Sequence, residues 1–303
     1  MPYIDQQEAS CTTTTYSDKL GGKNGGRVVL EGLLTDPPLV HFESPALALV
    51  ICQLRFSPVP LFRESTLIDS FYRTIQETYP QSARTAQVVF PFIADQSSGE
   101  LPTNLFWKFS SLDGRWTLVL SENALTLETR EYKSFEEFVT RFENAVQALI
   151  KTLNPALETR LGLRYINEFQ MSDAIGLQGW ARYIRPEILG LTGTIHELFQ
   201  QAEVVFSRQE LELRLSDGSL ILRHGLHSGT TVEPAEIVAQ NPNPSPSGPF
   251  YLLDMDRSES SPQQIEPSEI SARLAQFNRE IYRFFRWSML PDLFEVLGPK
   301  DGR

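Results

Sequence analysis

Two stretches of the chain share a Leu-Arg-aromatic core and alternate as β-strands do. Residues 160–169 read Arg-Leu-Gly-Leu-Arg-Tyr-Ile-Asn-Glu-Phe, and residues 50–56 read Val-Ile-Cys-Gln-Leu-Arg-Phe. Successive side chains of a strand point to opposite faces, so the leucines and the tyrosine of the later stretch share one face. Because Leu54-Arg55-Phe56 matches Leu163-Arg164-Tyr165, we expect two equivalent strands that open two related halves.

The two stretches begin segments in which the predicted elements follow the same order. A strand is followed by helical residues, by strands with an Asp-Gly hairpin, and by a long amphipathic helix. The hairpins are predicted at Asp113-Gly114 and Asp217-Gly218, where both turn positions are expected to need positive φ. We therefore predict an α+β fold of two related strand–helix–strands–helix halves, residues 37–157 and 158–303. They are expected to form a curved antiparallel sheet with helices packed on one face, similar to the duplicated fold of TATA-binding-protein-like domains.

Apolar side chains at three- and four-residue spacing predict three helices. The first is expected over residues 64–79, the second from a capping box at Ser134 to about Leu153, and the third from Pro267. Residues 87–93 are predicted as an edge strand, because a proline interrupts them and cannot donate to a strand ladder.

Two segments offer little apolar surface to bury. Residues 1–36 are rich in Thr, Gly and polar groups, and residues 229–249 contain five prolines. We therefore expect a disordered N-terminal tail and a mobile proline-rich loop.

The charge balance and the cysteine count limit the classes of function. With 38 acidic and 27 basic side chains, the formal net charge is −11. Nucleic-acid binding is disfavoured, because phosphate binding relies on clustered Lys and Arg. The two cysteines, Cys11 and Cys52, form neither a disulfide framework nor a metal-ligand spacing. Without a signal-peptide pattern or a membrane-spanning apolar run, the chain is expected to be cytoplasmic.

Several motifs of the chain resemble those of a known family. The matching residues are Pro37-Pro38-Leu39-Val40 leading into Val50–Pro58, a Phe71-Tyr72 helix ending at Tyr79-Pro80, Arg160–Glu168, and Leu253-Asp254-Met255-Asp256. As a set they resemble a sporadically distributed family of bacterial proteins of uncharacterised function. The resemblance implies a cytoplasmic bacterial protein and supplies no catalytic residues. The chain departs from the family in its long polar N-terminal segment and its insertion at residues 241–249.

Charged residues on the predicted strands are candidates for a site. If the leucines of the repeated strands face the helices, Arg55, Arg164 and Glu168 face the other way, and Asp254 and Asp256 alternate onto the same face. The arginines offer bidentate forks for a carboxylate, a phosphate or a peptide. The alternative is a lattice of solvated ion pairs, each contributing little to stability.

Other residues of the predicted strands could bind a metal ion or a nucleobase. Asp254, Asp256 and Glu168 could present oxygen ligands to Mg²⁺, and His224 with His227 has weak zinc-like spacing. Acidic residues on strands and pairs of surface histidines are both common without a bound ion, so we expect neither a metal nor a cofactor. The hairpin aromatics could stack nucleobases, but their strand spacing favours core packing; they are Phe106, Trp107, Phe109 and Trp116.

Two functions remain open. The first is a non-enzymatic binding or assembly module that recruits a partner macromolecule, a protein, through the open face of the sheet. The alternative is an enzyme that holds a phosphorylated or carboxylated substrate in an Arg/Asp/Glu groove. A deep pocket with convergent polar groups indicates an enzyme, whereas a broad and shallow face indicates a binding module.

Overall fold

The computed structural model describes residues 37–63, 65–88, 103–171, 173–174, 179–200, 204–228 and 248–300. The predicted tail (1–36) and most of the predicted loop (229–247) lie outside the described residues. Pro38–Arg303 form one compact unit, and both predicted halves contribute to its main sheet.

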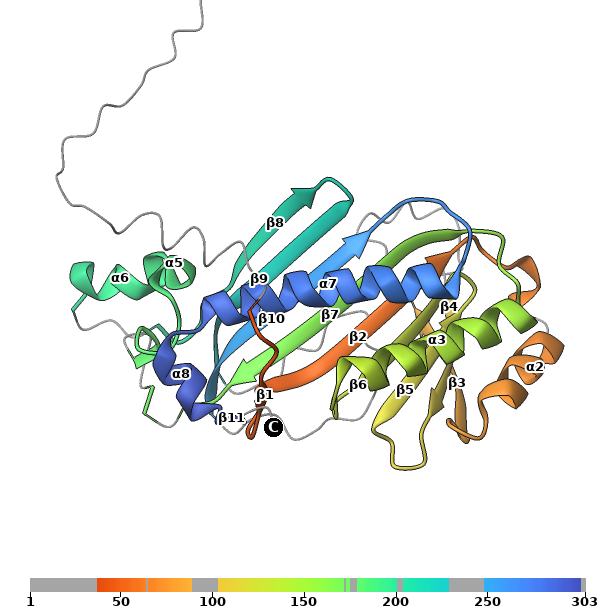
Figure 1. Cartoon of the computed structure of the whole chain (residues 1–303), viewed down its shortest axis with the longest axis horizontal. Helices are drawn as coiled ribbons and strands as arrows, with labels where there is room; N and C mark the ends of the chain where they lie inside the picture. The colour runs from red at the N-terminus through yellow and green to blue at the C-terminus, as the bar shows by residue number, and fades with distance from the viewer. Residues whose placement is uncertain are drawn as a thin grey trace, which may run out of the picture. The chain divides into compact units, whose positions relative to one another are not determined.

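Nine strands form one sheet in which each neighbouring pair is antiparallel. β2 and β7 pair with each other inside the sheet, which continues through β6, β5, β4 and β3 on one side and through β10, β9 and β8 on the other (Figure 1). A separate ribbon pairs β1 (His41–Phe42) with β11 (Pro299–Lys300). The strands of the sheet are β2 (Leu47–Phe56), β3 (Gln81–Val88), β4 (Thr103–Ser110), β5 (Trp116–Ser121), β6 (Ala124–Thr129), β7 (Glu158–Phe169), β8 (Gln209–Leu215), β9 (Gly218–Ser228) and β10 (Pro249–Glu259).

The long helices α2, α3 and α7 pack on one face of this sheet. α3 contacts both α2 and α7, and α7 lies over β7 and β10 (Figure 1). Ser134 caps α3 by accepting a hydrogen bond from the Glu137 backbone N–H at 3.1 Å, as the capping box predicts. Within the described ranges, no helix is long and apolar enough to cross a membrane. The helical elements are η1 (Pro60–Arg63), α2 (Ser65–Ile75), α3 (Phe135–Thr152), α5 (Pro186–Leu189), α6 (Leu191–Leu198), α7 (Pro267–Ser288) and α8 (Pro291–Val296).

The main core lies between the helices and the first face of the sheet. Leu54 of β2 and Leu163 of β7 are fully buried there, in one cluster with Phe142 of α3 and Phe277 of α7. Cys52 belongs to the same cluster, and burial raises the pKa of its thiol well above the usual range. The opposite side, called here the second face, carries a smaller cluster made of strand residues only.

Two predicted boundaries differ from those of the structure, and a third is described only in part. Of the strand predicted over 87–93, residues 87 and 88 belong to β3, Gln81–Val88, which pairs along its whole length with β4, and residues 89–93 lie outside the described residues. The helix predicted to reach residue 79 ends at Ile75, because the following residues form a hydrogen-bonded turn. The strand expected from residue 203 begins at Gln209, where the continuous ladder with β9 starts, although Ser207 already donates a backbone hydrogen bond to Leu226 of β9 at 2.9 Å.

Both Asp-Gly hairpins form, but only their glycines have positive φ. The φ angle is 70° at Gly114 and 150° at Gly218, whereas the preceding aspartates keep negative φ. The expectation that both turn residues need positive φ is therefore wrong. At Asp113 the carboxylate accepts hydrogen bonds from Ser111 Oγ and the Arg115 N–H, which holds the turn without αL geometry at the aspartate.

Candidate functional site

All five predicted site residues lie on the second face, on three adjacent strands. β2 supplies Arg55, β7 supplies Arg164 and Glu168, and β10 supplies Asp254 and Asp256. The strand register sets Asp256 directly opposite Arg164, and Asp254 one side-chain row further along. The alternation therefore places these side chains on one face, but their contacts divide them into separate groups.

Arg164 and Asp254 form a bidentate ion pair. Arg164 donates from Nε to Oδ1 of Asp254 at 2.8 Å and from Nη2 to Oδ2 at 2.6 Å. The side chains are only 11% and 3% exposed, and Arg223 Nη1 lies 3.6 Å from the same carboxylate. The lattice of ion pairs considered as an alternative is present here in its pairing but not in its solvation, because both side chains of this pair are largely buried. Removing either partner of a buried pair leaves a charge without compensation.

A second pair closes the middle of the face. Arg160 Nη2 lies 3.4 Å from Asp256 Oδ1, and the Arg160 guanidinium covers Gly162, where an added Cβ atom would lie 2.6 Å from Nη1. The remaining space is about 20 Å³, room for about one water molecule. It is lined by Ile51, Gln53, Thr126, Glu128, Arg160, Gly162, Arg164 and Asp256.

The other two candidates lie at the margins of this network. Arg55 is exposed and donates from Nε to Oε1 of Gln53 at 2.8 Å. Glu168 is half-buried, and its Oε1 atom is buried without a hydrogen-bond partner. Burial raises the pKa of Glu168, and the charge of Arg130 opposes this shift. A buried carboxylate oxygen without a hydrogen-bond partner lowers the free energy of unfolding. A contribution to stability therefore does not explain why a glutamate occupies position 168.

An apolar cluster on the second face was missed by the sequence reasoning. Leu49 and Ile51 of β2 are buried there with three residues of β7 and β10, namely Ile166, Phe250 and Leu252. A signal was present, since residues 46–52 are an unbroken apolar run. Such a run is typical of a strand buried on both faces, whereas a strand with one solvated face alternates.

The residues considered as metal ligands do not lie together as one group. Asp254 and Asp256 bind guanidinium groups, and the described part of the chain contains no group of three or more His, Cys, Asp or Glu side chains placed to hold an ion. His224 and His227 lie on opposite faces of β9. His224 Nδ1 is 3.0 Å from the Tyr251 hydroxyl in the main core, whereas His227 stacks on Phe250. Burial lowers the pKa of both histidines.

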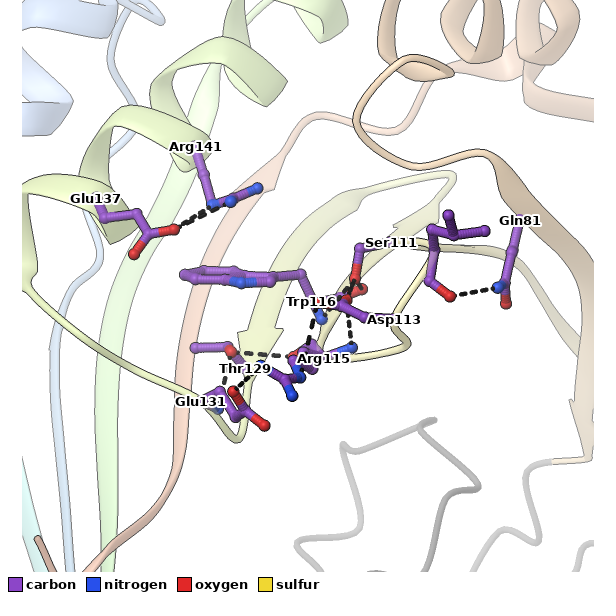
Figure 2. A network of polar contacts seen from close by, with 10 residues as sticks. Gln81, Ser111, Asp113, Arg115, Trp116, Thr129, Glu131, Glu137 and Arg141 are labelled. Carbon is purple, nitrogen blue, oxygen red and sulfur yellow. Dashed lines mark hydrogen bonds and ion pairs between the residues drawn. The ribbon is translucent and has the colours of Figure 1, made fainter. Parts of the chain in front are cut away.

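A wider cleft of about 680 Å³ lies beside the β4–β5 hairpin. Figure 2 shows two ion pairs at this cleft, Arg115 with Glu131 and Arg141 with Glu137. The closest N–O distances are 2.5 Å and 3.0 Å. The Arg141 guanidinium also lies 4.4 Å from the centroid of the Trp116 ring. Sequence reasoning did not find this cleft, because it brings together the turn after α2, the loop between β4 and β5, the loop before α3, and α3 itself. Its lining comprises Glu77, Thr78, Ser111, Leu112, Asp113, Arg115, Trp116, Glu131, Lys133, Glu137 and Arg141.

The hairpin aromatics pack into the protein. Phe106, Phe109 and Trp116 are buried, and Trp107 is partly buried against the main core. Arg141 covers the face of Trp116, and Phe109 contacts the rings of α2. These rings offer no free stacking platform for a nucleobase, in agreement with the predicted core packing.

Exposed apolar side chains concentrate around one edge of the sheet. Leu191 and Leu198 share one side of α6, being seven residues apart, and are largely exposed. Other exposed apolar residues of this region are Phe199, Val205, Phe206, Leu211 and Leu213. The glycine-interrupted sequence here has no clear periodicity, which is why this surface was not predicted.

The chain was compared with protein-family models, curated proteins and solved structures, and it matches none of them.

Proposed function

We propose that this protein is a non-enzymatic binding or assembly module that recruits a protein partner. The filling of the second face carries the proposal: its central guanidinium groups, those of Arg160 and Arg164, are paired with the protein's own carboxylates, around a space of about 20 Å³. Substrate pockets usually enclose about 300–1,000 Å³. An enzyme that binds phosphate or carboxylate in this groove would first have to break a buried ion pair. The acidic balance disfavours a nucleic-acid partner.

The exposed residues indicate where a partner would bind. The centre of the second face is buried, so it offers little contact area, whereas α6 presents Leu191, Leu198 and the adjoining Phe199 to solvent. Exposed apolar groups that gather in one region are typical of protein-binding surfaces. We therefore assign recruitment to the apolar surface of α6, with the exposed margin of the second face around Arg55 as a secondary contact.

We also propose that the two halves arose by duplication. Leu54-Arg55-Phe56 and Leu163-Arg164-Tyr165 are 109 positions apart, and so are Gln53 and Gly162, which lie directly opposite each other. A two-fold axis between Gln53 and Gly162 would therefore superpose the Leu-Arg-aromatic motif of β2 on that of β7. Four buried positions of α3 recur in α7 with a constant separation of 132 positions, namely Phe138 with Ile270, Phe142 with Leu274, Ala145 with Phe277, and Leu149 with Ile281. An experimental structure in which the two motif strands fail to superpose together with α3 and α7 would contradict this origin.

If the protein is an enzyme, the cleft shown in Figure 2 is a better substrate site than the second face. Its volume of about 680 Å³ suits a small ligand. A ligand there would compete with Glu131 for Arg115 and with Glu137 for Arg141. We rank this alternative second, because those internal pairs already neutralise both arginines.

Comparative capture tests the proposal. The tagged protein and two variants are used to capture partners from native cells, and each candidate partner is then purified and titrated. Leu191→Glu/Leu198→Glu places charge on α6, and Leu112→Glu places it on the lip of the cleft, at a leucine that is likewise largely exposed. We expect the α6 variant to lose the partner and the cleft variant to retain it. Equal affinity of all three proteins would refute the assignment to α6, and loss in the cleft variant alone would favour the alternative.

A further inference from the structure

Strand β8 forms one edge of the nine-stranded sheet. In the described residues it pairs with β9 on its inner side, and no strand lies on its outer side. Its five central residues, 210–214, are exposed whichever face they point to, and in Figure 1 the β8–β9 hairpin extends past α7. Unpaired backbone groups on a long edge strand are a template for another strand, and proteins usually block such edges.

The sequence of β8 is complementary to itself when read antiparallel. The strand is Gln-Glu-Leu-Glu-Leu-Arg-Leu, Gln209–Leu215. If two copies meet about a two-fold axis through Leu213, Glu212 of each copy lies opposite Arg214 of the other. In the same register Leu211 lies opposite Leu215 of the other copy, and Leu213 faces itself. Opposite charges and apolar pairs therefore both match across the strands.

The charges needed for this pairing are available. Among the described residues, Glu212 and Arg214 have no ion-pair partner within their own chain, whereas Glu210 is bound by Arg223 at 2.9 Å. The self-paired register leaves Glu210 opposite Ser216, so its internal ion pair need not break. The neighbouring register, with the axis through Glu212, would set Glu212 against its own copy, and like charges directly opposite are unfavourable.

We propose that β8 is a self-association edge, at which the β8 strands of two copies pair antiparallel about Leu213 and join the two sheets into one. The pairing keeps the helices of both copies on the same side, because directly opposite residues of antiparallel strands point to the same face. The apolar surface of α6 is not part of the paired strand. Self-association therefore adds two-fold symmetry to the proposed recruiting module without depending on its partner.

Analytical ultracentrifugation of the full chain over a roughly hundredfold range of concentration tests the proposal. The wild type is expected to approach twice the 34.4 kDa chain mass as concentration rises. Leu213→Lys, which brings two ammonium groups together at the axis, is expected to raise the dimer dissociation constant at least about tenfold. Leu157→Lys is the matched control, because Leu157 is 40% exposed and Leu213 37%; it should leave the constant unchanged.

A charge exchange tests the register and does not rely on Leu213. Glu212→Arg and Arg214→Glu should each weaken the dimer about tenfold, and the double exchange should restore it to within about threefold of the wild type. A wild type that stays monomeric throughout would overturn the proposal, as would a dimer that none of these variants weakens. Failure of the double exchange to restore the dimer would overturn the register. The capture experiment with the α6 variant tests partner recruitment independently. A monomeric wild type would therefore contradict the self-association proposal without contradicting partner recruitment.

Discussion

The two faces of the sheet exclude water from their centres by different means. On the first face, α3 and α7 cover a large apolar cluster that includes Leu54 and Leu163. On the second face, a cluster of five strand residues lies beside the buried Arg164–Asp254 pair. Polar groups are buried on both faces: Arg257 on the first is fully buried and pairs with Asp217 and Glu280.

This difference teaches that a row of charged residues on a strand does not by itself mark a solvated or catalytic surface. At the centre of the second face, Arg160 and Arg164 of β7 pair with aspartates of the adjacent strand β10, so this part of the row acts as part of the sheet. Buried pairs of this kind contribute little net stability compared with apolar packing but are costly to break. The faces should therefore respond differently to removal of one side chain, and four measurements test that contrast.

The largest effect is expected from Arg164→Ala. The change leaves the buried Asp254 carboxylate without its bidentate donor, which should cost about 3–5 kcal/mol of unfolding free energy. Arg55→Ala is the matched control, since this arginine is exposed, bonds Gln53 at 2.8 Å, and has no ion pair among the described residues; its loss should change stability by less than about 0.5 kcal/mol. Urea denaturation of both variants gives the comparison. Equal, small losses would show that the second face is solvated.

A slightly smaller effect is expected from Leu163→Ala. Leu163 is fully buried in the main core, so truncation removes apolar burial and leaves a cavity, at a cost of about 2–5 kcal/mol. Leu252→Ala makes the same change on the second face and should fall in the lower part of that range, because its cluster is smaller. A loss at Leu252 larger than at Leu163 would reverse the ranking of the two faces.

A change in the opposite direction is expected from Glu168→Gln. Burial raises the folded-state pKa of Glu168 above its usual 4.5, so its contribution is favourable below that pH and is lost as pH rises through the folded pKa. The amide removes the cost of the buried charge, and stability at neutral pH should increase by up to about 1 kcal/mol. Thermal melts at pH 4 to 8 would show the variant's gain growing with pH. A destabilised variant would mean that the carboxylate has a favourable partner.

The smallest effect is a pH dependence from the histidines. Burial depresses the folded pKa of His224 and His227 below the usual 6.5. The unfolded chain then binds protons that the folded chain does not, so stability is retained above about pH 6.5 and declines as pH falls below it. His224→Gln should flatten this decline by less than about 1 kcal/mol, measured as unfolding free energy at pH 5 and 7. An unchanged slope would assign the pH dependence to other groups.

Local patterns in the sequence were enough to place the long helices and the central strands. The stripe of Phe138, Phe142 and Leu149 and the capping Ser134 specify α3 by contacts within a few residues. The alternation in residues 160–169 likewise places Arg164 on the face opposite Leu163. Such features follow from the periods of 3.6 residues in a helix and two residues in a strand, which are visible in the sequence itself.

What tertiary structure alone decided was which residues meet. Asp254 is 90 positions from Arg164, and their pairing follows from the order β2-β7-β10 rather than from either strand's sequence. The same order buries the second face at its centre and leaves β8 at an edge, where its leucines and charges remain exposed. Alternation tells which way a side chain points, but burial and pairing depend on what the neighbouring strand places opposite it, and that neighbour is distant in the chain.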